Sequence, residues 1–321
     1  MSSPAIVGLG IANIDVVLRL TDMPRWKNPH VLRGFTLADG GPVGTACVVA
    51  SALGERTGFI DTFGNDDMAA IKRSKLEEFD VDLSHAVIRE APEDHVVIVY
   101  VKEDTGDRIF SFLPEFLQNP VLPEELDRDY ITSAQYLHLD CTHTEAALQA
   151  AKWMHEAGKT VVLDAGATEQ QVSGPVKKLV AETDILICGS GFGAMLTGHK
   201  DLWRAGLATL ELGPRVVVQT EGADGSYTLT KDQQFHTQAF EVDVIDTTGA
   251  GDVFHGAYLA GLVKGWNLER TATFSSAVSA IHCTTLGNRK GIPTLDEVEA
   301  FLKEHGRAYE EPDSKSNAQV E

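Results

Sequence analysis

Short apolar runs alternate with helix-like segments along most of this 321-residue chain, and this alternation restricts the possible folds more than any other feature. A buried strand, a helix and another buried strand form the βαβ unit, which builds a mostly parallel sheet covered by helices on both faces. The sequence therefore predicts an α/β fold. The expected strands are residues 5–9, 56–62, 136–140, 160–164, 185–188 and 215–220, and the expected helices are residues 44–53, 66–79, 144–157, 174–182, 200–210 and 268–284.

Two regions interrupt the alternation and predict a small second sheet. Residues 14–20 and 29–38 form one region, and residues 95–101 and 108–113 form the other. The second region reads as a β-hairpin, because its two alternating runs are joined by a short polar turn that contains glycine. We expect these strands, within residues 14–38 and 95–113, to form a lid inserted into one domain of residues 1–305. Residues 306–321 are polar and acidic, which is typical of a disordered tail.

The acidic composition argues against several classes of partner. With a formal net charge of -20, the surface repels nucleic-acid phosphates and anionic lipids. No stretch approaches the roughly 18 apolar residues of a membrane helix, and the N-terminus lacks a basic, apolar leader. We therefore expect a cytoplasmic protein that binds neither nucleic acid nor membrane. The four cysteines lie in apolar stretches and are expected to be buried and free: Cys47, Cys141, Cys188 and Cys283.

The segment Asp246-Thr-Thr-Gly-Ala-Gly-Asp252 joins an expected strand, residues 240–245, to an expected helix, residues 250–264. The first N–H groups of a helix have no intrahelical partner and lie at the positive end of its dipole, so this turn can bind an anion. Asp252 either stabilises the helix as a first-turn acid or acts as a general base for a hydroxyl group. A base beside an anion site is what phosphoryl transfer to an alcohol requires. The small residues that open the helix are Gly249, Ala250 and Gly251.

Between roughly residues 4 and 305, the chain resembles the ribokinase-like (PfkB) family of carbohydrate kinases. The segment Asp246-Thr-Thr-Gly-Ala-Gly-Asp-Val-Phe-His-Gly-Ala257 is similar to the C-terminal signature of the family. Gly40-Gly-Pro-Val-Gly-Thr-Ala46 and Ala52-Leu-Gly54 are similar to its N-terminal signature. The resemblance implies a ribokinase-like three-layer sandwich and ATP-dependent, Mg²⁺-dependent phosphorylation of a sugar hydroxyl. Asp252 would be the base, and the amides of residues 249–251 would form the anion hole.

The resemblance also implies a sugar site and a lid-mediated homodimer. Asn13 and Asp15 follow the first strand, where relatives place a carboxylate on sugar hydroxyls; a plain turn or lid-strand aspartate is the alternative. Gly40 and Gly41 let the backbone pass close to the ligand, or only form a tight turn. Pairing of the exposed edges of the lid strands across a dimer would protect those edges.

On the nucleotide side, Thr220, Gly222 and Gly225 resemble a turn along the phosphates and ribose, although a simple hairpin turn is the alternative. Residues 276–284 and 287–291 resemble the region that closes over adenine. Backbone carbonyls around Asp246 and Thr248 are expected to bind a monovalent cation such as K⁺. The full set of expected nucleotide residues is Thr220, Gly222, Gly225, Thr248, Gly249, Gly251, Ser276, Ala280 and Cys283.

The chain departs from the family pattern at two places. Thr45 stands where relatives usually carry an asparagine that binds a sugar hydroxyl, so the expected substrate contact there is a single hydroxyl group. Gly189 and Phe192 stand in place of the family's Asn-x-x-Glu near magnesium. Mg²⁺ can still be held by ATP oxygens and water, because this ion often keeps several waters.

The variant Gly-Pro-x-x-Thr-Ala, together with Gly287-Asn-Arg-Lys-Gly-Ile-Pro293, is most similar to the sulfofructose kinase branch. That resemblance implies 6-deoxy-6-sulfofructose as the substrate and a cationic side chain for its sulfonate. The candidates are Lys27, Arg33 and Arg108 in the lid. The alternative for each of them is a solvent-exposed charge of the lid with no role in binding.

His255, one turn into the helix that carries Asp252, is expected to be a packing or surface residue.

Three functions stay open. The leading one is an ATP-dependent kinase acting on a ketose-like sugar or derivative. The second is a nucleoside or small-alcohol kinase, for which Trp26, Phe35 and Phe112 would offer an aromatic platform. The third is a catalytically silent sugar- or nucleotide-binding regulator. The missing Asn-x-x-Glu favours this third function, whereas the retained Asp252 and anion hole oppose it.

Overall fold

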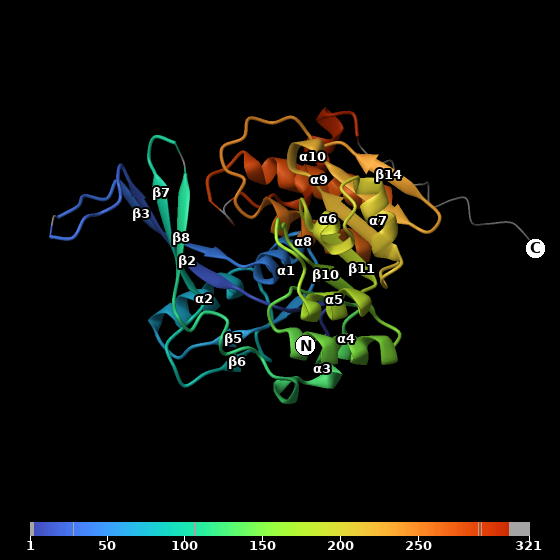
Figure 1. Ribbon diagram of the computed structural model, residues 1–321, viewed down its shortest axis with the longest axis horizontal. Coiled ribbons are helices and arrows are strands. Elements are labelled where there is room, and N and C mark those ends of the chain that lie inside the picture. Colours follow the sequence, from blue (N-terminus) through green and yellow to red (C-terminus); the bar gives the residue numbers. More distant parts are fainter. Residues whose placement is uncertain (1–2, 28, 106, 288, 290, 308–321) are drawn as a thin grey trace, which may run out of the picture.

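The centre of the molecule is an eight-stranded sheet in the order β14-β13-β12-β11-β10-β9-β1-β4. The computed structural model describes residues 3–27, 29–105, 107–287, 289 and 291–307 (Figure 1). From β4 to β12 the neighbouring strands are parallel, and β13 and β14 continue the sheet in antiparallel pairing. The strands are β1 (Ile6–Leu9), β4 (Thr57–Ile60), β9 (Tyr136–Leu139), β10 (Thr160–Asp164), β11 (Ile185–Cys188), β12 (Val216–Thr220), β13 (Ser226–Thr230) and β14 (Gln234–Thr237).

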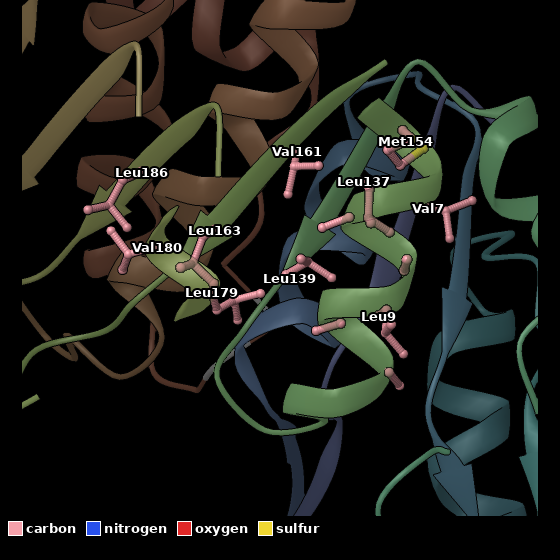
Figure 2. Packing of buried hydrophobic residues seen from close by; sticks show 14 of the residues in the cluster. Val7, Leu9, Leu137, Leu139, Met154, Val161, Leu163, Leu179, Val180 and Leu186 are labelled. Atoms are coloured by element: carbon pink, nitrogen blue, oxygen red, sulfur yellow. The ribbon is translucent and has the colours of Figure 1, made fainter. Parts of the chain in front are cut away.

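Helices cover both faces of this sheet, so the predicted three-layer α/β architecture is confirmed. Successive residues of a strand point to opposite faces. In β1, Val7 and Leu9 pack in the core with α4 and α5, whereas Ile6 packs in the core with α1 and α8. Figure 2 shows the first of these cores. Because both faces are buried, the strands read as continuous apolar runs. The covering helices are α4 (Thr144–Glu156) and α5 (Gly174–Ala181) on one face, and α1 (Pro42–Ala52), α8 (Ala250–Val263) and α9 (Leu268–Cys283) on the other.

Shorter elements connect and border these layers. In the described part of the chain, no helix combines the length and apolar character needed to cross a membrane. The remaining elements are α2 (Asp67–Glu77), α3 (Arg128–Ser133), α6 (Phe192–Thr197), α7 (Leu202–Leu210), α10 (Leu295–Glu304), the 3₁₀ helices η1 (Pro123–Glu125) and η2 (Gly222–Asp224), and the two-stranded sheet of β5 (Thr62–Phe63) and β6 (Val87–Ile88).

A second sheet of four strands, here called the lid sheet, stands to one side of the α/β body (Figure 1). Its strand order is β3-β2-β7-β8, so that a parallel pair, β2 and β7, is flanked by two antiparallel partners. Pairing of β7 with β8 confirms the predicted hairpin. The lid strands are β2 (Asn13–Leu20), β3 (Gly34–Gly40), β7 (Val96–Lys102) and β8 (Arg108–Phe112).

Two local predictions differ from the structure, and one hairpin was missed. The expected strand at residues 240–245 is wrong: this segment is irregular, with Val244 and Ile245 more than half exposed and the Ile245 N–H bonded to the Cys283 carbonyl of α9. Residues 29–33 lie outside β3, and the hairpin of β13 and β14 was not predicted. Of the expected tail, residues 308–321 lie outside the described residues, and the proposed domain limits stay a prediction.

A buried charge cluster joins the lid sheet to the α/β body. We call it the Asp61 cluster; its members are Asp61, Lys72, Glu93, His95 and His143. The Nζ atom of Lys72, on α2, lies 3.0 Å from Asp61 Oδ2 and 3.2 Å from Glu93 Oε1. Asp61 also contacts His95 Nδ1 at 3.3 Å and His143 Nε2 at 2.9 Å. All five side chains are almost completely shielded from solvent.

The Asp61 cluster holds the starting points of both central lid strands. The N–H of Ala12, just before β2, donates to Asp61 Oδ2 at 3.0 Å. His95 directly precedes β7. Burial by itself would raise the pKa of Asp61, but Lys72 and the two histidines together lower it well below its usual range. The carboxylate therefore stays ionised and bonded at the base of the lid sheet.

Replacing Lys72 with methionine is expected to destabilise the protein by about 3–5 kcal/mol, because it leaves two buried carboxylates without their cation. Urea denaturation measures the effect. Lys75→Met on the same helix is the matched control, since Lys75 is partly exposed and pairs with Glu78 at 3.2 Å. An exposed pair of this kind contributes less than about 1 kcal/mol. Equal losses in the two variants would contradict the role given to the Asp61 cluster.

Candidate active site

A cavity of about 990 Å³ opens at the carboxyl ends of three neighbouring strands of the central sheet. Its lining includes Asp164 at the end of β10, Ser190 just after β11 and Thr220 at the end of β12. In open α/β sheets, ligands bind at this edge. The opposite wall comes from the start of α8 and the later part of α9.

The cavity brings together most of the residues predicted for the nucleotide. Thr248 and Gly249 are not among the lining residues, although Thr247 before them and Ala250 after them are. The expected strand at residues 240–245 instead contributes an irregular apolar wall to the same cavity. The predicted residues in the lining are Thr220, Gly222, Gly225, Gly251, Ser276, Ala280 and Cys283, together with Ala250 and Asp252.

The turn that opens α8 contains two glycines whose backbone bears on the predicted anion site. Gly249 caps the helix with a φ of 75°, a left-handed conformation that favours glycine. Gly251 lines the cavity, and a Cβ built on it would meet no atom within 4 Å. Protein packing therefore does not explain the missing side chain at Gly251, and its backbone is open to a ligand. The Ala250 N–H already donates to the Thr247 carbonyl at 3.2 Å.

Asp252, in the first turn of α8, is a carboxylate with a raised pKa. Burial is the main cause, and the neighbouring carboxylate of Asp164 adds to it. The guanidinium of Arg289 acts in the opposite direction and lowers the pKa of Asp252. A carboxyl group whose proton affinity lies above the usual range is better suited to accept a proton near neutral pH.

Arg289 is a buried cation that the sequence interpretation did not select as a site residue. Its side chain is 4% exposed; Nη1 lies 2.9 Å from Asp39 Oδ2, and Nη2 donates to the Gly40 carbonyl at 3.2 Å. It therefore ties the end of lid strand β3 to the surroundings of Asp252. The only sequence signal was an arginine between Gly287 and Gly291, since nothing local marks an arginine as buried.

Four of the residues predicted for the substrate lie together at the start of the lid sheet. Asn13 Nδ2 donates to Asp15 Oδ1 at 2.6 Å, and Asn13 pairs with Gly40 in the β2–β3 ladder. A Cβ on Gly40 would lie 3.0 Å from Asp15 Oδ2, and one on Gly41, at a φ of 91°, would lie 2.5 Å from the Ile11 carbonyl. Glycine is therefore required at position 41, whereas a side chain at position 40 would be tight against the ends of Asn13 and Asp15.

Asp15 and Thr45 differ in burial: Asp15 is partly exposed, whereas Thr45 is shielded from solvent. Burial and the neighbouring Asp39 raise the pKa of Asp15 to about 6, although Arg289 and Arg108 lower it. Thr45 is completely buried in α1, where its N–H donates to the Gly41 carbonyl at 2.9 Å.

The three predicted lid cations lie in different surroundings. Arg108, at the start of β8, bonds to Thr248 Oγ1, and its Nη2 lies 2.8 Å from Asp246 Oδ1. It thereby connects the lid sheet to the turn before α8. Arg33 forms a 3.6 Å ion pair with Glu103 on the lid surface, and Lys27 is exposed to solvent. Only Arg108 of the three contacts the predicted anion turn.

Asp246 and Thr248, the predicted monovalent-cation residues, are joined by side-chain contacts. Asp246 Oδ1 accepts from the Thr248 N–H at 3.0 Å and from Thr248 Oγ1 at 2.7 Å. Although burial raises it, hydrogen bonds led by that of Arg108 lower the pKa of Asp246 to about 2. The Thr248 carbonyl contacts His282 Nε2 at 2.9 Å. Binding of K⁺ at these residues stays a prediction.

Known proteins match nearly the whole chain. The model of the pfkB family carbohydrate kinases matches residues 4–295. An ATP-dependent ribose-1-phosphate kinase of Halopiger xanaduensis is 27% identical, with 93% of this chain and 98% of the relative covered. A nucleoside kinase of Methanothermobacter thermautotrophicus is 24% identical, with 96% and 98% covered. The crystal structure of a ribokinase of Thermotoga maritima superimposes with a TM-score of 0.82 at 26% identity, covering 94% of this chain and 99% of its own, which confirms the predicted ribokinase-like fold.

Proposed function

The chain belongs to the pfkB family of carbohydrate kinases, and we propose that it transfers the γ-phosphoryl group of ATP to a hydroxyl of a ketose-like sugar or sugar derivative. One observation carries this proposal: Gly251 and Asp252, on a single turn of α8, line the same cavity. The proposed anion site and a carboxyl group with a raised pKa would thus stand side by side, as phosphoryl transfer to an alcohol requires.

In the proposed reaction, Asp252 takes the proton of the substrate hydroxyl. The hydroxyl oxygen forms a bond to the γ-phosphorus while the bond from that phosphorus to the bridging oxygen of ADP breaks. Of the backbone amides of residues 249–251, those of Gly249 and Gly251 stabilise the negative charge on the transferred group, and that of Ala250 joins them only on leaving the Thr247 carbonyl. The proton then stays on the Asp252 carboxyl, whose raised pKa favours this state until it is released to solvent.

The volume and the lining of the cavity support ATP as the phosphoryl donor. Its volume of about 990 Å³ lies at the upper end of the ~300–1,000 Å³ range of ligand pockets. Gly222 and Gly251 leave room at the phosphate side, and Phe240, Val242 and Ala280 supply an apolar wall for the base. Mg²⁺ would neutralise phosphate charge, and ATP oxygens and retained water would supply its ligands.

The sugar would bind between the start of the lid sheet and Asp252, with strands from residues 14–38 and 95–113 acting as the lid. Asn13 and Asp15 would fix its hydroxyl groups. A sulfonated ketose such as 6-deoxy-6-sulfofructose belongs to this substrate class, and Arg108 is the lid cation closest to the anion turn.

A nucleoside substrate is the second candidate, because one relative is a nucleoside kinase and the lid exposes Phe35 and Phe112.

The lid sheet also supports a homodimer. Its edge strands, β3 and β8, carry exposed apolar side chains, and an unpaired edge of this kind is a site for pairing with a second chain. The exposed side chains are Phe35, Ile109, Phe110 and Phe112.

ATP consumption measured with ketoses, ketose phosphates, sulfosugars and nucleosides tests the proposed function. We expect turnover with a ketose-like acceptor, and a loss of about 10²- to 10⁴-fold in kcat for Asp252→Asn with KM little changed, because only the base is removed. Asp67→Asn, an exposed first-turn aspartate of α2, is the matched control and should keep full activity.

Near-normal activity in Asp252→Asn would contradict the mechanism. Tight ligand binding without turnover of any acceptor would instead indicate a silent regulator.

The same assay in K⁺ or choline salts tests the cation site at Asp246 and Thr248, and equal rates in both salts would exclude it.

Arg289→Gln is expected to shift the ascending limb of the pH profile of kcat/KM to higher pH. A carboxyl with a raised pKa is protonated, and inactive as a base, below that pKa; removing the guanidinium removes the interaction that lowers it. Arg289→Lys keeps a cation and should shift the limb less. A lower kcat with an unchanged limb in Arg289→Gln would show that the residue acts only through packing.

Analytical ultracentrifugation of the full-length protein is expected to give the mass of a dimer. Phe110→Lys, which places a charge on edge strand β8, should shift the population to the monomer without unfolding the α/β body. A monomeric wild-type protein would contradict dimerisation through the lid sheet.

A further inference from the structure

Three side chains of types that can bind a metal converge from three separate elements, and two of them, Asp164 and His255, line the cavity. His138 lies on β9, Asp164 at the end of β10 and His255 on α8. One ligand atom of each lies within 4.8 Å of the other two, and His255 Nε2 is 3.5 Å from Asp164 Oδ2. All three residues are buried.

The sheet register explains why these side chains meet. His138 pairs with Val162 of β10, and Val162 packs in the core on the face that α8 covers. Asp164, two residues further along β10, points to that same face. His255 enters from α8 above it, so that the two imidazoles lie with ring centroids 5.7 Å apart.

The imidazoles lack the hydrogen bonds that buried polar groups normally make. Both ring nitrogens of His138 and the Nδ1 of His255 are shielded from solvent and have no partner. The ring of His138 lies near the Val162 backbone without forming a hydrogen bond of normal geometry. Because an unpaired buried polar group is costly, such a group points to a missing ligand. A packing role, expected for His255 from the sequence, leaves these nitrogens unexplained.

A second group of possible ligands in the described part of the chain shows what a satisfied cluster looks like. Glu93, Asp94 and His95 also lie close together, but Lys72 Nζ is 3.2 Å from both Glu93 Oε1 and His95 Nδ1. An ammonium group therefore already supplies the positive charge there. Among the described residues, no lysine or arginine contacts the cluster of His138, Asp164 and His255.

We propose that His138, Asp164 and His255 bind one divalent transition-metal ion, at a site distinct from any Mg²⁺ carried by a nucleotide. Two imidazoles and one carboxylate are typical ligands of Zn²⁺ and related ions, with a fourth position left for water or substrate. Ligand atoms about 2.1 Å from one tetrahedral ion lie roughly 3.4 Å apart, close to the separation of His255 Nε2 and Asp164 Oδ2. The cavity provides entry, because Asp164 and His255 line it.

Full-length protein freed of metal with a chelator and then titrated with Co²⁺ tests this site. We expect one Co²⁺ per chain, with the visible absorption of a tetrahedral ion bound by nitrogen and oxygen, and retention in a large excess of Mg²⁺, which prefers oxygen ligands. His255→Gln and Asp164→Asn should each weaken binding by more than about tenfold. The matched control is His155→Asn, an exposed histidine beside Glu182 and Asp184 that could bind metal adventitiously.

Several results would overturn the proposal: no Co²⁺ bound by the wild type, displacement by Mg²⁺, loss of the bound ion in His155→Asn, or unchanged binding in a folded His255→Gln protein. Far-UV circular dichroism checks that each variant folds. If neither site variant folds, the wild-type spectrum decides, because the weak absorption of an octahedral, all-oxygen ion contradicts the site. None of these measurements uses turnover, so they are independent of the proposed kinase activity.

Discussion

The ionised carboxylate of Asp61 fixes where the lid sheet stands relative to the central sheet. One of its oxygens accepts the Ala12 N–H at the start of β2 and contacts Lys72, while the other contacts His143 at the start of α4. Burying these charges costs desolvation energy, so the cluster is poorly explained as a source of stability alone. Its structural effect is positional: Asn13 and Asp15 lie within three residues after Ala12, and their place therefore depends on Asp61.

A second buried charge, that of Arg289, connects this lid base to the proposed chemistry. The guanidinium contacts Asp39 and the Gly40 carbonyl on β3, and its charge lowers the pKa of both Asp15 and Asp252. One cation thus acts on a residue of the expected sugar site and on the expected base. Arg108 makes the corresponding contact from the other edge strand of the lid sheet, where it bonds to Asp246. The position of the lid and the electrostatics of the site are therefore coupled.

The sequence predicted the regular elements well wherever local pattern and burial agreed. The parallel strands read as apolar runs because helices cover both of their faces, and the β7–β8 hairpin read as alternating runs around a polar turn. Residues 240–245 also carry a strand-like apolar pattern but pair with no strand among the described residues. Four of them, Phe240, Glu241, Val242 and Val244, line the cavity instead. The β13–β14 hairpin was missed because its strands are rich in polar residues, as suits the edge of a sheet.

By itself, the sequence determined the α/β class and marked the Asp246–Asp252 turn, because helix starts, glycine conformations and strand periodicity are local properties of the chain. Tertiary structure alone decided which distant charges meet. Arg289 contacts Gly40 across 249 positions, and His138, Asp164 and His255 come from three elements that no short motif connects. Local periodicity carries no signal for such contacts, because they depend on sheet register and on helix packing across the sheet. The lid cations show the same limit: Lys27, Arg33 and Arg108 read alike in sequence, yet only Arg108 reaches the turn before α8.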